Sequence, residues 1–223
     1  MMRILFLKCI WCSLGLLITS GLVLSCVPEQ SDVSCVEIRQ NELRSLPYDN
    51  ATKSQVLTWI MDNYQLDNAT ITEEDGRLRW LNGNSGYVAT FEHGTLKRVG
   101  IDWRKGYEPT IQEVLACLGP PDYYTAALKP DQEVRFELSL WYLDEGLVVN
   151  SLSFSRLEPV QPIVREDRRV THMVVFQPGS IVDTIVRVYD YSSVADVPDT
   201  LLGTLKPWPG DLSQIAIENL LPQ

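Results

Sequence analysis

The chain has little of the side-chain chemistry on which most enzymes depend. Its 223 residues include only two histidines, His93 and His172, and neither has cysteine or histidine neighbours at the spacing of known zinc sites. The sequence also lacks the G-x-S-x-G elbow of serine hydrolases and the glycine-rich loop that cradles phosphates. We therefore expect no metal site, no cofactor and no catalytic residue, and the sequence identifies no small-molecule substrate. For the same reason we expect neither a buried carboxylate pair nor a histidine–carboxylate pair in the main cleft.

Carboxylates are plentiful, but their positions are typical of turns. Glu73-Glu74-Asp75 and Asp144-Glu145 both come before a glycine, which is usual for solvated loop tips. A glycosidase would need two carboxylates facing each other at a fixed separation, and a sequence cannot show that arrangement. An extracytoplasmic hydrolase with an acidic active site therefore stays open as an alternative function.

An excess of basic residues is also absent. The chain has 19 lysines and arginines against 29 aspartates and glutamates, and its formal net charge is −10. An acidic surface repels nucleic acids and anionic lipid headgroups. The charge balance therefore argues against a nucleic-acid partner and against attachment to a membrane through a basic patch.

What the sequence does have is an apolar opening segment. Arg3 and Lys8 are the only charges before Glu29, and the run between them and Glu29 ends in small residues. A positive start, an apolar stretch and small residues at a cleavage point are the marks of a secretory signal. Residues 1–25 are therefore predicted to be a signal peptide. An uncleaved signal anchor is the competing interpretation, because about 20 apolar residues can span a bilayer.

The end of this segment, LVLSC, resembles a bacterial lipobox. The resemblance implies that the peptide is cut after Ser25 and that Cys26 receives a diacylglycerol and becomes the new N-terminus. Buried acyl chains contribute about 0.8 kcal/mol per CH₂, and a second chain makes anchoring stable. The expected location is the extracytoplasmic side of the cell membrane, with the lipid as the membrane contact. Ordinary secretion, with Cys26 an accidental neighbour of the cleavage point, is the other alternative.

Two further cysteines remain in the body of the chain. Cys35 lies in a stretch that resembles a tether, and Cys117 lies in the helical pattern VLACL. In an extracytoplasmic compartment the two could pair. We favour the interpretation that Cys117 is simply a small buried apolar residue.

The body contains one pattern twice. TKSQVLTWI begins at Thr52 and TIQEVLACL begins at Thr110, and each opens with the Thr-x-x-Gln/Glu signature of a helix capping box. Apolar residues then recur on one helical face, and Gly119 with the prolines after it predicts where the second helix ends.

Each predicted helix is followed by alternating apolar residues and a turn at Gly94 or Gly146, which is typical of a hairpin. The repeat predicts an α+β fold of two tandem units, each a helix plus an antiparallel sheet, joined to a C-terminal strand and helix segment. The expected divisions are a tether over 26–45, units over 46–104 and 105–160, and a C-terminal segment over 161–223 that packs on the second unit.

The second unit also resembles a known family. TIQEVLACLGPPD, followed by a hairpin containing LWYL, looks like the SmpA/OmlA (BamE-type) lipoprotein domain, and Leu118, Gly119 and Pro121 carry the match. A tandem pair of such domains resembles the β-lactamase inhibitor protein, and the whole layout is similar to uncharacterised lipoproteins of Chloroflexi-type bacteria. The first unit lacks the Gly-x-Pro that would follow its helix. The resemblance implies a non-enzymatic binding or assembly module of the cell envelope with a protein partner.

The strand around Trp141 is apolar on both faces, which predicts that both faces are covered. The C-terminal segment is the expected cover, because the apolar stretch 171–190 and the tail through Trp208 have no other obvious place to pack. Within this segment the apolar spacing after Ser180, with Ser180 and Asp183 as a cap, predicts a helix. Trp141 is then no partner site. Trp208, in the loop KPWPG, is the candidate for partner contact, because aromatic residues on loops often serve as exposed anchors.

Overall fold

The computed structural model describes residues 35–66, 70–130, 134–155, 164–189, 191 and 193–219. All described residues belong to one compact unit, Asp32–Gln223. The predicted signal peptide, residues 1–25, and the predicted lipidation site, Cys26, lie outside the described residues. Among the helices described, none combines the length and the apolar character needed to cross a bilayer.

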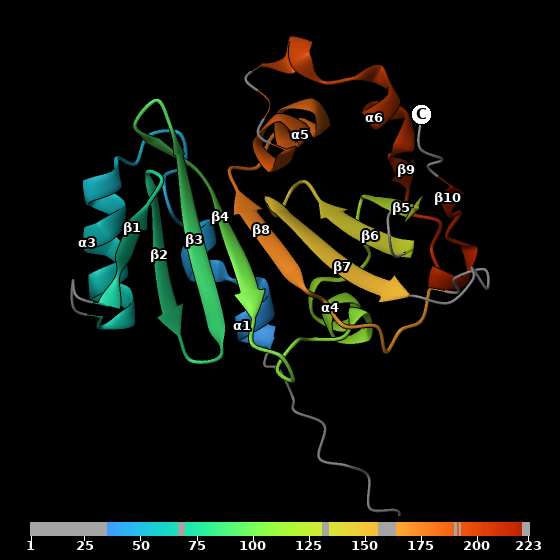
Figure 1. Cartoon of the computed structure of the whole chain (residues 1–223), viewed down its shortest axis with the longest axis horizontal. Helices are drawn as coiled ribbons and strands as arrows, with labels where there is room; N and C mark the ends of the chain where they lie inside the picture. The colour runs from blue at the N-terminus through green and yellow to red at the C-terminus, as the bar shows by residue number, and fades with distance from the viewer. Residues whose placement is uncertain are drawn as a thin grey trace, which may run out of the picture. The chain divides into compact units, whose positions relative to one another are not determined.

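One sheet organises the described residues (Figure 1). Its ten strands are β1 (Thr72–Glu74), β2 (Arg77–Asn82), β3 (Ser85–Glu92), β4 (Thr95–Trp103), β5 (Tyr123–Pro130), β6 (Val134–Tyr142), β7 (Leu147–Ser155), β8 (His172–Phe176), β9 (Lys206–Pro207) and β10 (Glu218–Asn219). Their order is β1-β2-β3-β4-β8-β7-β6-β5-β10, with β9 also paired to β5. All pairs are antiparallel except β5 with β10.

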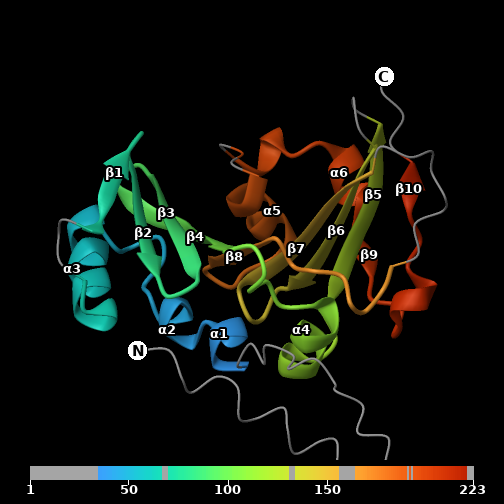
Figure 2. The same cartoon turned by 60° about the horizontal axis from the view of Figure 1, so that its bottom comes forward.

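The helices are short and lie on both faces of this sheet. They are α1 (Cys35–Arg39), α2 (Asn41–Arg44), α3 (Lys53–Tyr64), α4 (Ile111–Leu118), α5 (Ile181–Tyr189) and α6 (Asp199–Thr204), with 3₁₀ turns at Val194–Asp196 and Leu212–Gln214. Figure 2 shows α1, α2 and α4 on one side of the sheet, and α5 and α6 on the other.

The predicted fold class, two tandem helix-plus-sheet units, is wrong. The strands after α3 and those after α4 belong to one continuous sheet, because β8 lies between β4 and β7 and pairs with both. The physical reason is in the sequence of β8, HMVVF, whose last four residues are buried. A strand that is apolar on both faces is stable where both faces are covered, which here is the middle of the sheet.

The local predictions for the repeated helices are confirmed. The Thr52 amide donates to the Gln55 side chain at 2.8 Å, and the Thr110 amide donates to the Glu113 carboxylate at 2.6 Å, so both capping boxes are formed. Helix α4 ends at Gly119, which has a φ of +81°. These signals are readable from the sequence because each depends on residues only a few positions apart.

Two apolar clusters hold the sheet. The larger one contains side chains from α1 to α4 and one face of every long strand. The smaller one, on the other face, is built around Trp141, Val174 and Phe176 and is covered by residues of α5 and α6. Trp141 has no exposed surface, as its two-sided apolar strand predicted, so it cannot be a partner site.

The expected tether does not extend to residue 45. Ile38 and Leu43, in α1 and α2, are fully buried in the larger cluster. A disulfide joins Cys35 of α1 to Cys117 of α4, with 5.3 Å between the two Cα atoms. The favoured interpretation of Cys117 as an unpaired buried residue is therefore wrong. The sequence could not reveal the pair, because the two cysteines are 82 positions apart and meet only through the tertiary packing of α1 on α4.

Gly94 and Gly146 both have the positive φ predicted for them, +85° and +62°, but their surroundings differ. A side chain at Gly94 would meet no atom within 4 Å, whereas a Cβ at Gly146 would overlap the carbonyl oxygen of Phe176. We expect Gly94→Ala to lower the free energy of unfolding by about 1 kcal/mol, and Gly146→Ala to lower it by about 3 kcal/mol or more.

Urea unfolding of the two variants measures this difference. Gly94→Ala is the matched control, because it carries the same backbone strain without the overlap. Equal losses in the two variants would show that the contact between the turn and β8 is looser than described.

Candidate functional site

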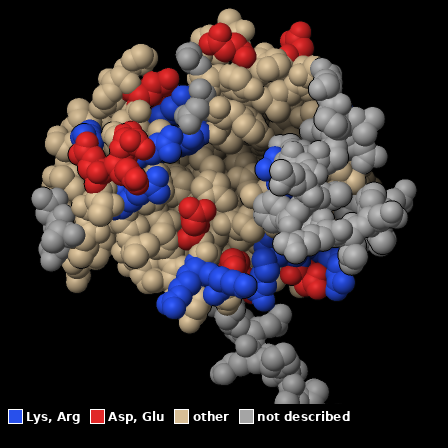
Figure 3. Space-filling model, viewed as in Figure 1, with Lys and Arg blue, Asp and Glu red and all other residues tan. Residues whose placement is uncertain are grey.

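A cleft opens on the face of the sheet that carries α5, in the part that the helix leaves uncovered. Its volume is about 540 Å³, within the range of ligand sites. We call it the sheet cleft and define it by six of its lining residues: Arg79, Asp102, Ser139, Asn150, His172 and Tyr189. Figure 3 looks onto this face and shows it hollowed at the centre, with basic and acidic side chains at the rim.

A row of polar side chains crosses the floor of the sheet cleft. Asp102 of β4 pairs directly with His172 of β8, His172 with Asn150 of β7, and Asn150 with Ser139 of β6. Residues directly opposite each other in neighbouring strands point to the same face of a sheet. Four consecutive strands therefore each supply one polar side chain to a line that runs perpendicular to them.

The neighbouring row explains why this line is polar. On the same face, two positions away along each strand, a second row contains Gly100, Val174, Val148 and Trp141. The last three of these residues lie in the apolar cluster under α5. Helix α5 thus covers the apolar row and leaves the polar row open. The boundary between the two rows is the inner wall of the sheet cleft.

Asp102 and His172 form a hydrogen-bonded pair, with 2.8 Å between Asp102 Oδ1 and His172 Nδ1. We expected no histidine–carboxylate pair in the main cleft, and that expectation is wrong. Because an ionised carboxylate only accepts hydrogen bonds, Nδ1 is the donor of this pair, and in the neutral tautomer Nε2 is left as an acceptor. The ring lies against Gly100, where a Cβ would come within 3.0 Å of His172 Cε1, so a side chain at position 100 would displace it.

Asn150 and Ser139 extend the floor beyond His172. Ser139 is 9% exposed and Asn150 is half-buried. Within the part of the chain that the structure describes, neither the Asn150 amide nor the Ser139 hydroxyl has a hydrogen-bond partner. Buried polar groups are normally satisfied, so such groups on a cleft floor are suited to a ligand or to water.

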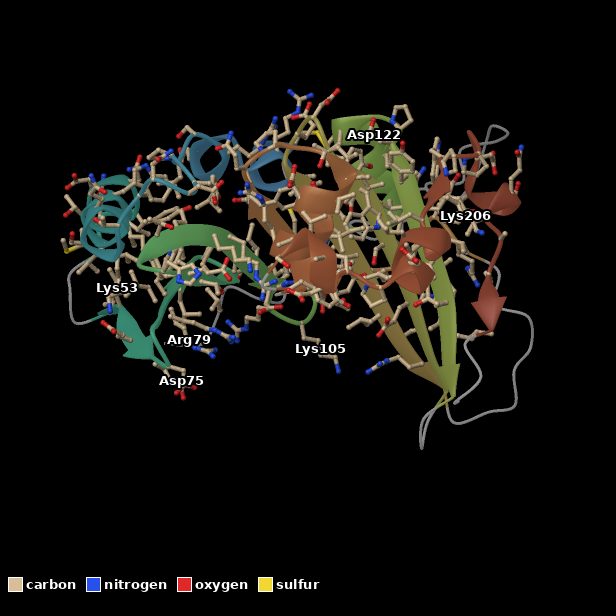
Figure 4. The ribbon with its side chains drawn as sticks, turned by 90° about the horizontal axis from the view of Figure 1, so that it is seen from above. Lys53, Asp75, Arg79, Lys105, Asp122 and Lys206 are labelled. Carbon is tan, nitrogen blue, oxygen red and sulfur yellow. A yellow bond between two sulfur atoms is a disulfide. The ribbon has the colours of Figure 1, made fainter. Side chains whose placement is uncertain are left out.

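Three arginines line the side of the cleft toward β2. Arg79 pairs with Glu74 at 3.2 Å, and Arg98 donates to the carbonyl oxygens of Arg187 and Val188 at the end of α5. Arg77 is exposed and has no ion-pair partner among the described residues. Seen from above in Figure 4, Arg79 projects from the same side of the sheet as Lys105, and Asp122 lies on the opposite side.

Tyr189, the last residue of α5, closes the cleft on the side of the helix. Its ring lies 6.1 Å from that of Trp141, centroid to centroid. Partial burial, the nearby Glu137 carboxylate and Tyr191 raise the pKa of Tyr189 to about 12. Its hydroxyl therefore keeps its proton at neutral pH and can donate a hydrogen bond to a ligand.

The site residues named from the sequence lie elsewhere. Trp208 is half-buried, and its ring meets that of Tyr124 edge-to-face at 6.5 Å, away from the sheet cleft. Gly94 and Gly146 lie in hairpin turns. Sequence reasoning missed the polar row, although a signal was present: Ser139 lies between Leu138 and Leu140, and Asn150 directly follows the apolar run LVV.

The described residues contain no group of three or more histidine, cysteine, aspartate or glutamate side chains placed to hold a metal ion. The chemistry that the floor offers is hydrogen bonding, with one imidazole nitrogen as an acceptor. No protein-family model, no curated protein and no solved structure matches this chain. The resemblance to the BamE-type domain therefore depends only on the residues quoted for it.

Proposed function

We propose that the protein is a lipid-anchored binding module on the extracytoplasmic side of the cell envelope. Its binding surface is the open face of the sheet around the sheet cleft, and its partner is another envelope protein. The observation that supports this proposal most directly is the uncovered polar row on a sheet whose opposite face is packed against α1 to α4.

Exposed apolar side chains around the cleft support the same surface. Of the five large apolar residues that are exposed within the described ranges, three, Leu81, Leu152 and Tyr189, lie at or beside it. A second hollow, lined by Leu81, shares Arg79 and Asp102 with the sheet cleft. Apolar residues gathered at the rim of a polar floor are typical of a surface that a partner covers.

The disulfide supports the proposed compartment. Disulfides persist in oxidising, extracytoplasmic surroundings and are rare in the reducing cytosol. The Cys35–Cys117 bond lies nine residues after Cys26 and joins the first described helix to the core. If a lipid on Cys26 anchors the chain, the disulfide-linked body begins nine residues after the anchor.

The Asp102–His172 pair favours a second candidate, an extracytoplasmic hydrolase. A carboxylate and the imidazole that it orients are two of the three members of a catalytic triad. The third member, a nucleophile beside the imidazole, is not in place among the described residues of the cleft. Ser139 lies two strands from His172, about 10 Å at the spacing of strands in a sheet, with Asn150 between them. A binding module releases its ligand unchanged, whereas a hydrolase would return it cleaved.

Site-specific crosslinking in intact cells tests the leading proposal. A photoreactive phenylalanine analogue at Leu152, on the rim of the cleft, should capture an envelope protein. The matched control position is Gln112, which is exposed on α4 at the other face of the sheet. In a Cys26→Ser background the protein should leave the membrane fraction, lose labelling by a fatty-acid probe and lose the crosslink.

Two results would contradict the proposal. Fatty-acid labelling that persists after Cys26→Ser would show that Cys26 does not carry the lipid anchor. Capture from Gln112 as efficient as capture from Leu152 would show that the open face of the sheet has no special role.

A further inference from the structure

We infer that the floor of the sheet cleft binds a saccharide that carries an acidic group. The inference rests on the proposed function, because it names the chemistry that the open face of the sheet recognises. The saccharide could belong to an envelope polysaccharide or to a glycan on the protein partner, and the chemistry of recognition is the same for both.

The spacing of the floor groups is the first argument. His172 Nε2, the Asn150 amide and the Ser139 hydroxyl lie on three neighbouring strands, and strands are about 4.8 Å apart. The three groups therefore span roughly 10 Å, about the length of two sugar rings, and a cleft of about 540 Å³ has room for a ligand of that size.

The hydrogen-bonding character of these groups is the second argument. A sugar hydroxyl both donates and accepts, so it is matched by groups that can do either. Asn150 and Ser139 each offer a donor and an acceptor, and His172 offers an acceptor whose orientation is held by Asp102. An extended peptide is a weaker fit, because its main chain would seek the open edge of a strand, and β6, β7 and β8 are paired on both sides.

The walls supply the remaining features of the ligand. Leu152, Val88 and the ring of Tyr189 offer apolar surface to the C–H face of a sugar. On the opposite side Arg77 has no ion-pair partner among the described residues. A guanidinium binds a carboxylate or phosphate group with two parallel hydrogen bonds, so an acidic sugar is preferred to a neutral one.

A glycan array that displays acidic and neutral oligosaccharides tests the inference on the purified chain. Isothermal titration of digalacturonate against its neutral counterpart, galactobiose, then measures the preference for the acidic group. We expect acidic oligosaccharides to bind, and Asn150→Leu and Ser139→Ala each to weaken binding about tenfold. Arg77→Gln should reduce the preference for digalacturonate and leave galactobiose unaffected.

The variants are chosen so that folding is not in question. Because the Asn150 amide and the Ser139 hydroxyl have no protein partner among the described residues, removing them should leave the melting temperature unchanged. Asn63→Leu is the matched control, since Asn63 is an exposed asparagine on α3, which packs against the other face of the sheet. It should bind like the wild type.

Each outcome has a defined meaning. Binding to no oligosaccharide at millimolar concentration, or binding that Asn150→Leu and Ser139→Ala leave unchanged, would overturn the inference. If a crosslink from Leu152 to a protein were still found after such a result, the proposed function would stand and only the saccharide site would be given up. Cleavage of a bound oligosaccharide, lost in His172→Ala, would support the saccharide site and replace the binding module with the hydrolase.

Discussion

A chain that ends after Phe154 is expected to lose its cooperative unfolding transition and to bind a hydrophobic dye strongly. The truncation removes β8, which pairs with β4 and β7 in the middle of the sheet, and α5, which covers Trp141. Four residues of β8 are buried, and full burial of one such side chain stabilises a fold by about 1.5–3 kcal/mol. Their sum is comparable to the whole stability of a typical domain, about 5–15 kcal/mol.

The control for this experiment is a chain that ends after Ile217. It loses β10, a two-residue strand at the edge of the sheet, and keeps β8 and α5. It should unfold cooperatively and stay silent to the dye. If the shorter chain also remained monomeric, soluble and dye-silent, residues 155–223 would be an independent appendage, and the Trp141 surface would return as a possible binding site.

Cys35→Ser is expected to lower the free energy of unfolding by about 4 kcal/mol, because a link across 82 positions removes much of the conformational entropy of the unfolded chain. In a body of this size the melting temperature should fall by roughly 8–16 °C. Cys35 is the better residue to replace, since it is exposed and Cys117 is packed in the core. Calorimetry in the absence of reductant makes the measurement.

Reductant supplies the matched control. Treatment of the wild-type chain with dithiothreitol should reproduce the melting temperature of Cys35→Ser, and the variant itself should not respond. The hydrogen bonds from the Arg39 guanidinium to the Cys117 carbonyl, at 3.0 and 3.2 Å, do not require the disulfide and should keep α1 near α4. A wild-type chain that is insensitive to reductant would contradict the assigned role of the bond.

The sequence alone was sufficient wherever the physics is local. The two capping boxes, the positive φ of Gly94 and Gly146, and the end of α4 at Gly119 each depend on a few adjacent residues. The helix after Ser180 was predicted in the same way, from its apolar spacing and from Ser180 as its cap. In the structure the Ser180 hydroxyl accepts a hydrogen bond from the Asp183 amide. The pattern of apolar residues also predicted that both faces of the Trp141 strand are covered. Successive side chains of a strand point to opposite faces, and in this strand the residues on each face are apolar.

The candidate site could not be read from the sequence in the same way. Asp102 and His172 are 70 positions apart, and they meet because β8 pairs with β4 in one particular register. A shift of that register by one residue would turn His172 to the other face, and the polar row would not exist. The sequence shows polar residues beside apolar ones in each strand, but it does not show which strands are neighbours.

The sequence by itself thus determined the local elements of this protein, because caps, turns and alternating burial are set by neighbouring residues. Only the tertiary structure decided that the two repeated halves form one sheet, that Cys35 meets Cys117, and that four strands align one polar side chain each. Those features depend on strand order and register, and the free energy that selects them comes from burying β8 and α5 against segments far away in the chain.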